Sequence, residues 1–189
     1  MLAASKRASL AAEQTKRKGR MLDFLFRRLT AEWPGAPLFD AATGEARRPH
    51  WYVEGKVPDT LDGRFAVLAT VLAFTMARLE RDGEGGDAAS AALTERFIEV
   101  MESEHRELGM GDPTLGKTVR RLVGSLAGRV ELWRAATHGE REWIEATRES
   151  LYRDPAPADA LQHCAEALKR LWSTLEAASL DDLKQGKLQ

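Results

Sequence analysis

The histidines and carboxylates of this 189-residue chain are the first place to look for chemistry. Glu102 and His105 form a Glu-x-x-His pair, which has the spacing of one half of a di-iron carboxylate site. Such a site needs a second Glu-x-x-His, and the sequence has none, because His163 and Glu166 come in the opposite order. A solvated His105 is therefore the simpler interpretation, and we predict no metal site.

Nucleophilic and phosphate-binding patterns are equally weak. The serines have no recognisable His/Asp partners, and His50 and His138 fall in predicted loops with no carboxylate at ligand spacing. Gly109-Met110-Gly111 is a single glycine pair, which is more typical of a turn than of a phosphate cradle. The one cysteine, Cys164, excludes an internal disulfide and a zinc cluster and fits a reducing compartment. We expect no catalytic residues, no cofactor and no enzyme activity.

Composition narrows the class of protein further. The formal net charge of −1 argues against a general DNA-binding role, which needs a basic surplus. Few β-branched residues and many Ala, Leu, Glu and Arg predict an all-α chain. The length predicts a single domain with a sizeable core, which we expect to be monomeric. The first twenty residues lack the apolar segment of a secretory signal.

One central helix is predicted to organise the rest of the chain. Residues Phe65–Leu79 are almost all apolar, and a helix apolar on most of its circumference must lie inside a bundle. It is too short for a membrane span, and Arg64 and Arg78 flank it. Asp59 and Thr60 are good N-cap residues for its start.

Other helices are predicted around it, for a single bundle of about six. Apolar stripes and capping residues predict helices over 21–33, 87–108, 112–133, 140–151 and 157–175. Gly124 and Gly128 lie within one of them, four residues apart, a spacing that favours close approach of another helix. The prolines and glycines of 33–57 predict a long irregular loop before the central helix.

The two ends of the chain differ from the middle. Residues 1–20 form a basic arm, which could be a solvated tail, an arm for anionic lipid or RNA, or an organelle presequence. Met21 is an alternative start. The helical domain is expected over 21–180, followed by a polar, frayed tail at 181–189.

The helix predicted over 21–33 has two interpretations. It is either the first helix of the bundle or an interfacial helix with its apolar side among lipid headgroups and its arginines on the phosphates. The membrane-contact candidates are Leu22, Leu25, Phe26, Arg27 and Arg28.

Four motifs carry a resemblance to a known family. They are Arg47–Tyr52 (RRPHWY), Val57–Phe65 (VPDTLDGRF), Arg106–Asp112 (RELGMGD) and Gly128-Arg129. In this order and spacing they resemble the signature of the ubiquinol–cytochrome c chaperone family, and the match spans roughly the middle half of the chain. Its usual blocks are Arg-x-Pro-x-Phe-Tyr, Gly-Val-Pro-Asp-Thr-x-x-Gly-Arg-Phe, Leu-Arg-Glu-Met-Gly-Val-Gly-Asp and Phe-Tyr-Gly-Arg.

This chain departs from the family pattern mainly on helix positions. Trp51 replaces Phe, Lys56 stands where Gly is usual, and His105 replaces Leu. Thr70-Val71 replaces Leu-His in the central helix, and Leu126-Ala127 replaces Phe-Tyr. The chain therefore resembles a divergent, bacterial member, and a role for the family histidine is in doubt here.

The resemblance implies an assembly factor for the cytochrome bc complex that binds newly made cytochrome b or another subunit. It would work in the cytoplasm at the inner-membrane face, or on the matrix side in a mitochondrion, with weak contact to anionic membrane or ribosome. The alternative is a membrane- or ribosome-docking adaptor that acts through the basic N-terminus without a cytochrome client.

The motif charges predict ion pairs at helix corners. We expect Arg64 or Arg106 to contact Asp59, Asp62, Glu107 or Asp112 and so to lock two corners at one end of the bundle. The same end is the candidate partner-binding surface. Its motif residues are Trp51, Tyr52, Pro58, Asp59, Thr60, Gly63, Arg64, Phe65, Arg106, Glu107, Gly109, Gly111, Asp112, Gly128 and Arg129.

Overall fold

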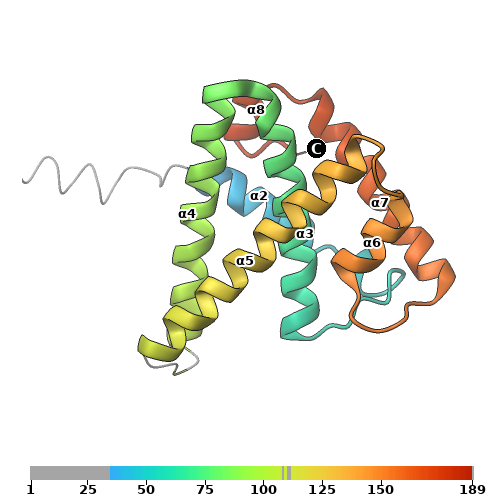
Figure 1. The fold of residues 1–189 in the computed structure, drawn as a ribbon, viewed down its shortest axis with the longest axis horizontal. Coiled ribbons are helices and arrows are strands. Elements are labelled where there is room, and N and C mark those ends of the chain that lie inside the picture. The colour runs from blue at the N-terminus through green and yellow to red at the C-terminus, as the bar shows by residue number, and fades with distance from the viewer. Residues whose placement is uncertain (1–34, 108, 110–111, 189) are drawn as a thin grey trace, which may run out of the picture. The chain divides into compact units, whose positions relative to one another are not determined.

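A computed structural model describes residues 35–107, 109 and 112–188 (Figure 1). The basic arm and the membrane-contact candidates between Leu22 and Arg28 lie outside these residues. The elements are α2 (Ala36–Ala46), η1 (Pro49–Trp51), α3 (Leu61–Leu79), η2 (Glu80–Asp82), α4 (Gly83–Glu107), α5 (Asp112–Thr137), α6 (Trp143–Leu151), α7 (Ala158–Ala177) and α8 (Leu180–Lys184), where η marks a 3-10 turn. The described part of the chain contains no strand, and the all-α prediction is confirmed.

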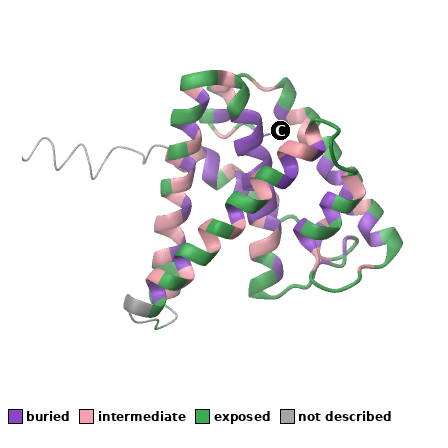
Figure 2. Cartoon of the chain, viewed as in Figure 1, coloured by how far each residue is buried: buried purple, intermediate pink, exposed green. Residues whose placement is uncertain are grey.

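Helix α3 lies at the centre, as its composition predicts. Every residue from 69 to 79 is buried, and α2, α4, α5, α6 and α7 all contact the helix (Figure 2). The Thr60 hydroxyl caps its start by accepting a hydrogen bond from the Gly63 N–H at 3.2 Å. Gly63 is required there, because a Cβ on it would lie 1.9 Å from the Pro58 carbonyl oxygen.

An aromatic cluster joins α3 to three neighbouring helices. The Phe74 ring lies 4.4 Å from the Trp133 ring of α5, 5.8 Å from that of Trp143 of α6 and 5.7 Å from that of Trp172 of α7, between centroids. Phe74 and Trp133 have no exposed surface. Since aromatic pairs at such separations attract each other beyond their buried area, this cluster holds the second half of the chain on α3.

Two polar groups inside the bundle are fully partnered. The Thr70 hydroxyl lies 2.6 Å from the Ser150 hydroxyl, which also accepts a hydrogen bond from Trp133 Nε1 at 3.1 Å. Through this contact Thr70 ties α3 to the end of α6.

Arg78 performs the corresponding task at the other end of α3. Its guanidinium donates to the carbonyls of Leu175 and Ala178, at 2.9 and 2.7 Å, and to the Asp82 carboxylate at 2.5 Å. The arginine therefore satisfies carbonyls at the end of α7 that the helix itself leaves unpaired.

The prediction of a long irregular loop over 33–57 is wrong for most of residues 36–51, which form α2 and η1. Pro37 lies in the first turn of α2, where a missing N–H costs nothing, and Gly44 is exposed in the last turn. Leu38, Phe39 and Ala42 then supply a buried face. Prolines and glycines at the helix ends hid this stripe from a pattern-based prediction.

Three further boundaries differ from the prediction. Helix α4 begins at Gly83, before the predicted start at residue 87, and α6 begins at Trp143, after the predicted start at residue 140. The tail predicted to be polar and frayed contains α8, and its Leu183 and Leu188 are buried against the core. These two leucines are far apart in an otherwise polar segment, so the sequence carries no helical stripe to reveal them.

Candidate functional site

A cleft of about 390 Å³ lies where the start of α3, the second half of α5, and the end of α6 with the segment after it meet. It is the place where the structure brings the largest number of motif residues together. Those that line it are Pro58, Thr60, Gly63, Phe65 and Arg129. Residues 149–157, which no motif marked, form the opposite wall.

Two ion pairs lie on the cleft rim. Arg64 Nε contacts the Asp59 carboxylate at 2.5 Å, which confirms the predicted arginine–carboxylate contact and holds the pKa of Asp59 below its ordinary value. Asp62 pairs with Arg153 across the cleft at 2.9 Å. All four side chains are well exposed, so these pairs add little stability. Among the described residues, neither pair reaches the α4–α5 corner.

Arg129 forms part of the cleft floor. Its guanidinium donates to the Ser150 carbonyl at 2.9 and 3.3 Å and to the Ser125 hydroxyl at 2.5 Å. Burial, together with the charge of Arg153, lowers the pKa of Arg129. This motif arginine therefore caps the C-terminus of α6 and carries its charge to the cleft without a carboxylate of the described residues within 4.0 Å.

Trp51 and Tyr52 are placed as anchors of the fold. Trp51 has no exposed surface, and its Nε1–H donates to the Glu45 carbonyl at 3.0 Å. Tyr52 is half-buried and donates to the Ala46 carbonyl at 2.7 Å. The expectation that Trp51 contacts a partner is wrong, because a side chain with no exposed surface cannot meet one while the chain is folded.

Tyr152 is a wall residue that sequence reasoning missed. Its hydroxyl donates to the Gly55 carbonyl at 2.5 Å and lies 3.2 Å from Cys164 Sγ. Burial raises the pKa of the Tyr152 hydroxyl and also that of the Cys164 thiol. Position 55 must be a glycine, because a Cβ there would lie 2.4 Å from the sulfur of Cys164. No local sequence pattern links Tyr152 to Gly55, because the two are 97 positions apart.

His50 and His163 meet on the outside of this region. Nδ1 of His50 lies 3.2 Å from Nε2 of His163, and the Glu45 carboxylate lies 3.7 Å from the other ring nitrogen of His50. The predicted loop position of His50 gave no sign of either partner. The described residues contain no group of three or more His, Cys, Asp or Glu side chains positioned to hold a metal ion.

The motif at the α4–α5 corner lies apart from the cleft lining. Gly109 has φ +82° and donates its N–H to the Arg106 carbonyl at 3.0 Å, which is the geometry of a glycine that ends a helix. Arg106 and Glu107 are exposed in the last turn of α4, and Asp112 begins α5. His105 Nδ1 donates to the Met101 carbonyl at 2.8 Å. Gly111 lies outside the described residues.

A known family profile matches most of this chain. The sequence profile described as "Ubiquinol-cytochrome C chaperone" matches residues 53–189, which is more than half of the chain. The chain belongs to the ubiquinol–cytochrome c chaperone family. Comparison with curated proteins finds no match.

A solved structure supports the fold of this ubiquinol–cytochrome c chaperone family member. The crystal structure of the Cbp3 homolog from Brucella abortus superposes with a TM-score of 0.68 at 22% sequence identity. The match covers 87% of this chain and 93% of that one. At this identity the likeness concerns the fold. No helix among the described residues is both long and apolar enough to cross a membrane.

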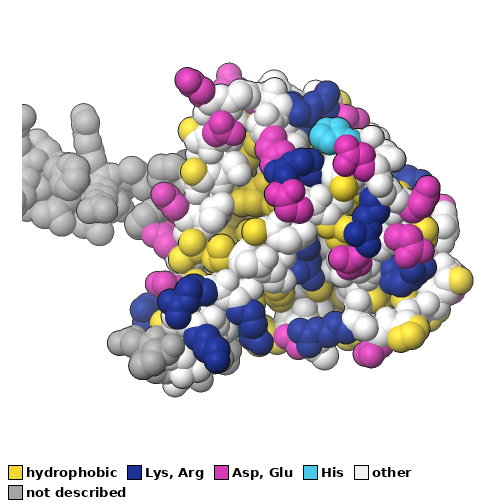
Figure 3. Space-filling view, viewed as in Figure 1, with side chains coloured by type: hydrophobic (Ala, Val, Ile, Leu, Met, Phe, Trp, Pro, Cys, Tyr) yellow, Lys and Arg dark blue, Asp and Glu magenta, His cyan; other side chains and the backbone are white. Residues whose placement is uncertain are grey.

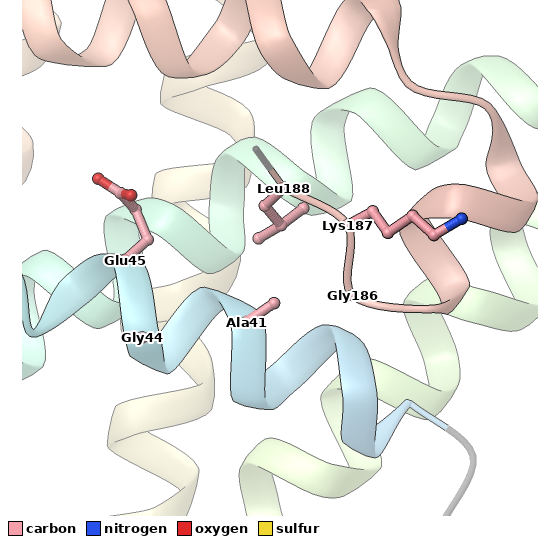
Figure 4. A pocket seen from close by; sticks show the side chains of 6 residues that line it. All are labelled: Ala41, Gly44, Glu45, Gly186, Lys187 and Leu188. Atoms are coloured by element: carbon pink, nitrogen blue, oxygen red, sulfur yellow. The ribbon is translucent and has the colours of Figure 1, made fainter.

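A second hollow, of about 420 Å³, is lined by none of the family motif residues. It lies between α2 and residues 186–188, and Glu45 and Lys187 are its charged side chains (Figure 4). Both charges are engaged elsewhere: Glu45 contacts Arg48 at 3.1 Å, and Lys187 contacts Asp182 at 2.8 Å. The motif-lined cleft is therefore the better candidate for the functional site of this family member.

Proposed function

We propose that this protein is an assembly factor of the cytochrome bc complex that holds newly made cytochrome b before its partner subunits dock. The observation that carries the proposal is the family match over residues 53–189. A binding role without catalysis is consistent with the sequence, in which no nucleophile, acid/base pair or cofactor motif was recognised.

The cleft supports the proposal as the place of contact. Its rim combines charges of both signs, from Lys56, Arg153, Asp62 and Asp154. Leu61, which is 63% exposed, lies between the cleft residues Thr60 and Asp62 at the start of α3. An apolar side chain within a charged rim is the composition expected where a polar connecting segment of a membrane protein docks.

The proposed place of action is the cytoplasmic face of the inner membrane, or the matrix face in a mitochondrion. There a peripheral protein reaches the polar connections of cytochrome b and its segments that are not yet inserted. The amphipathic stretch 21–33 is proposed to assist through weak contact with anionic lipid or the ribosome.

A deletion strain tests the function. Without this protein, mature bc complex and assembled cytochrome b should fall strongly while transcript levels stay normal. Spectra of the b-type haems and native gels of solubilised membranes measure both. A deletion strain with full bc-complex content would exclude the assembly role and leave the docking-adaptor alternative.

A charge reversal tests the site. Arg153→Glu should remove the pair with Asp62 and place a negative charge on the cleft rim, so that cytochrome b no longer copurifies with the protein. Lys169→Glu, an exposed residue on α7, is the matched control and should bind as the natural protein does. Equal binding by both variants, with unchanged thermal melts, would exclude the cleft as the contact site.

A further inference from the structure

The first half of α5 carries a basic surface. Lys117, Arg120 and Arg121 are exposed, and the sequence has no acidic residue between Pro113 and Val130. Arg106, exposed in the last turn of α4, lies at the same end of the bundle. Figure 3 shows Lys and Arg side chains gathered where α4 meets α5. We call these four residues the α5 basic face.

These cations differ from most other arginines of the protein. Among the described residues, nine arginines form ion pairs within 4.0 Å: Arg48, Arg64, Arg78, Arg81, Arg96, Arg134, Arg141, Arg148 and Arg153. None of the four residues of the α5 basic face pairs with a carboxylate of the described residues. The described contacts therefore give these charges no role inside the fold.

Two exposed glycines follow the cations along α5. Lys117, Arg121, Gly124 and Gly128 follow one another at spacings of three and four, which places them on one side of α5. A Cβ added at Gly124 or Gly128 would meet no atom within 4 Å, so the close helix approach predicted from this pair is not found among the described residues. With no bulky side chain beside the cations, a flat surface can approach them closely.

The shape and chemistry of the face select among anionic partners. Nucleic acid that is bound as a single strand is held by aromatic side chains on which bases stack, and the exposed residues of this face include none. The overall charge of −1 also differs from the strong surplus typical of nucleic-acid binders. An anionic membrane needs only a cluster of about four or more basic residues, each contributing about 1 kcal/mol.

We propose that the α5 basic face binds the anionic headgroups of a membrane. The inference rests on the proposed function, since a client that is a membrane protein gives this contact its purpose. Binding through a few exposed cations is weak, reversible and sensitive to salt, because exposed charges are screened beyond about 8 Å at physiological ionic strength.

Vesicle flotation of the full chain tests the proposal. Phosphatidylcholine vesicles with and without phosphatidylglycerol are mixed with the natural protein, with Arg120→Glu/Arg121→Glu, and with the control Lys169→Glu/Arg170→Glu. The control reverses two adjacent exposed cations on α7 and changes the net charge equally. Each comparison is repeated with Lys16→Glu/Arg17→Glu added, so that the basic arm does not conceal the effect.

The α5 variant should lose about tenfold or more of its binding to anionic vesicles, as expected for two cations worth about 1 kcal/mol each. The control should bind like the natural protein, and none should float with neutral vesicles. Equal flotation of the α5 variant and the control in both backgrounds would overturn the proposal. Loss of RNA binding by the α5 variant, with flotation unchanged, would instead assign the face to nucleic acid. Because the assay uses purified protein and lipid, its result is independent of bc-complex assembly.

Discussion

The guanidinium of Arg129 donates two hydrogen bonds to the backbone carbonyl of Ser150, at 2.9 and 3.3 Å. A residue of the family motif on α5 thus holds the end of α6, and this contact shapes the floor of the cleft. The hydroxyl of the same serine meets Thr70 and Trp133, so Ser150 joins α3, α5 and α6 at one point.

Arg129→Lys should lower the free energy of unfolding by about 1–2 kcal/mol, because lysine keeps the charge but loses the planar set of donors for the carbonyl. Chemical denaturation measures the change. Arg121→Lys, exposed on the same helix, is the control and should have almost no effect. Equal stability of the two variants would show that the Ser150 contacts do not hold α6.

Phe74→Ala should lower the free energy of unfolding by about 3–5 kcal/mol, because the ring is fully buried between three tryptophans and its removal leaves a cavity. Thermal melting followed by circular dichroism should show a midpoint roughly 10 °C lower. Phe65→Ala, at a partly buried ring, should cost less. A value near zero for Phe74→Ala would contradict the central position of α3.

Arg78→Ala should lower the free energy of unfolding by about 3 kcal/mol. The change removes the buried cation that pairs with Asp82 and leaves two carbonyls at the end of α7 unpaired. Arg81 offers a close control, because it joins η2, directly after α3, to α7 but through an exposed pair with Glu176. Arg81→Ala should leave the unfolding midpoint almost unchanged. Similar losses in the two variants would exclude burial as the source of the effect.

Arg64→Lys should not change the unfolding midpoint measurably. The Asp59 contact uses only Nε, and both side chains are more than half exposed. Solvent screens such pairs, so replacing the guanidinium by an ammonium removes little. A clear fall in the midpoint would show that the pair is better shielded than its exposure indicates.

Cys164 should resist alkylation in the folded protein. The thiolate is the reactive form, and burial raises the pKa of this thiol, so its thiolate fraction at pH 8 is small in a side chain that reagents cannot reach. Mass spectrometry after iodoacetamide treatment should find no adduct at Cys164 until the protein is denatured. In Ser173→Cys, whose new thiol is exposed on the same helix, the native protein should gain one adduct. Rapid labelling of native Cys164 would contradict its packing against Tyr152.

Sequence alone was most informative where one helix carried its own signal. The apolar run Phe65–Leu79 and the Thr60 cap each depend on residues within a few positions, and both were found as predicted. Sequence-based prediction failed where residues are buried by contacts with segments distant in the chain. The stripe of α2 is hidden by Pro37 and Gly44, and Leu183 and Leu188 find their core only after α2 and α4 are in place.

The motifs predicted the Arg64–Asp59 contact but not the shape of the site. Tyr152 and Ser150 belong to no motif, and their partners Gly55 and Thr70 are eighty or more residues away. Trp51 was among the candidate partner-binding residues, whereas its indole fills the interior and donates a hydrogen bond to the Glu45 carbonyl.

The sequence by itself determined that this protein is all-α, that α3 is its centre and that its motifs are those of the ubiquinol–cytochrome c chaperone family. These properties follow from local periodicity, capping and residue order, which do not depend on tertiary contacts. Only the tertiary structure decided which motif residues are anchors and which line a cleft, because burial and the partners of Arg129, Tyr152 and Arg78 arise when helices distant in the chain pack together.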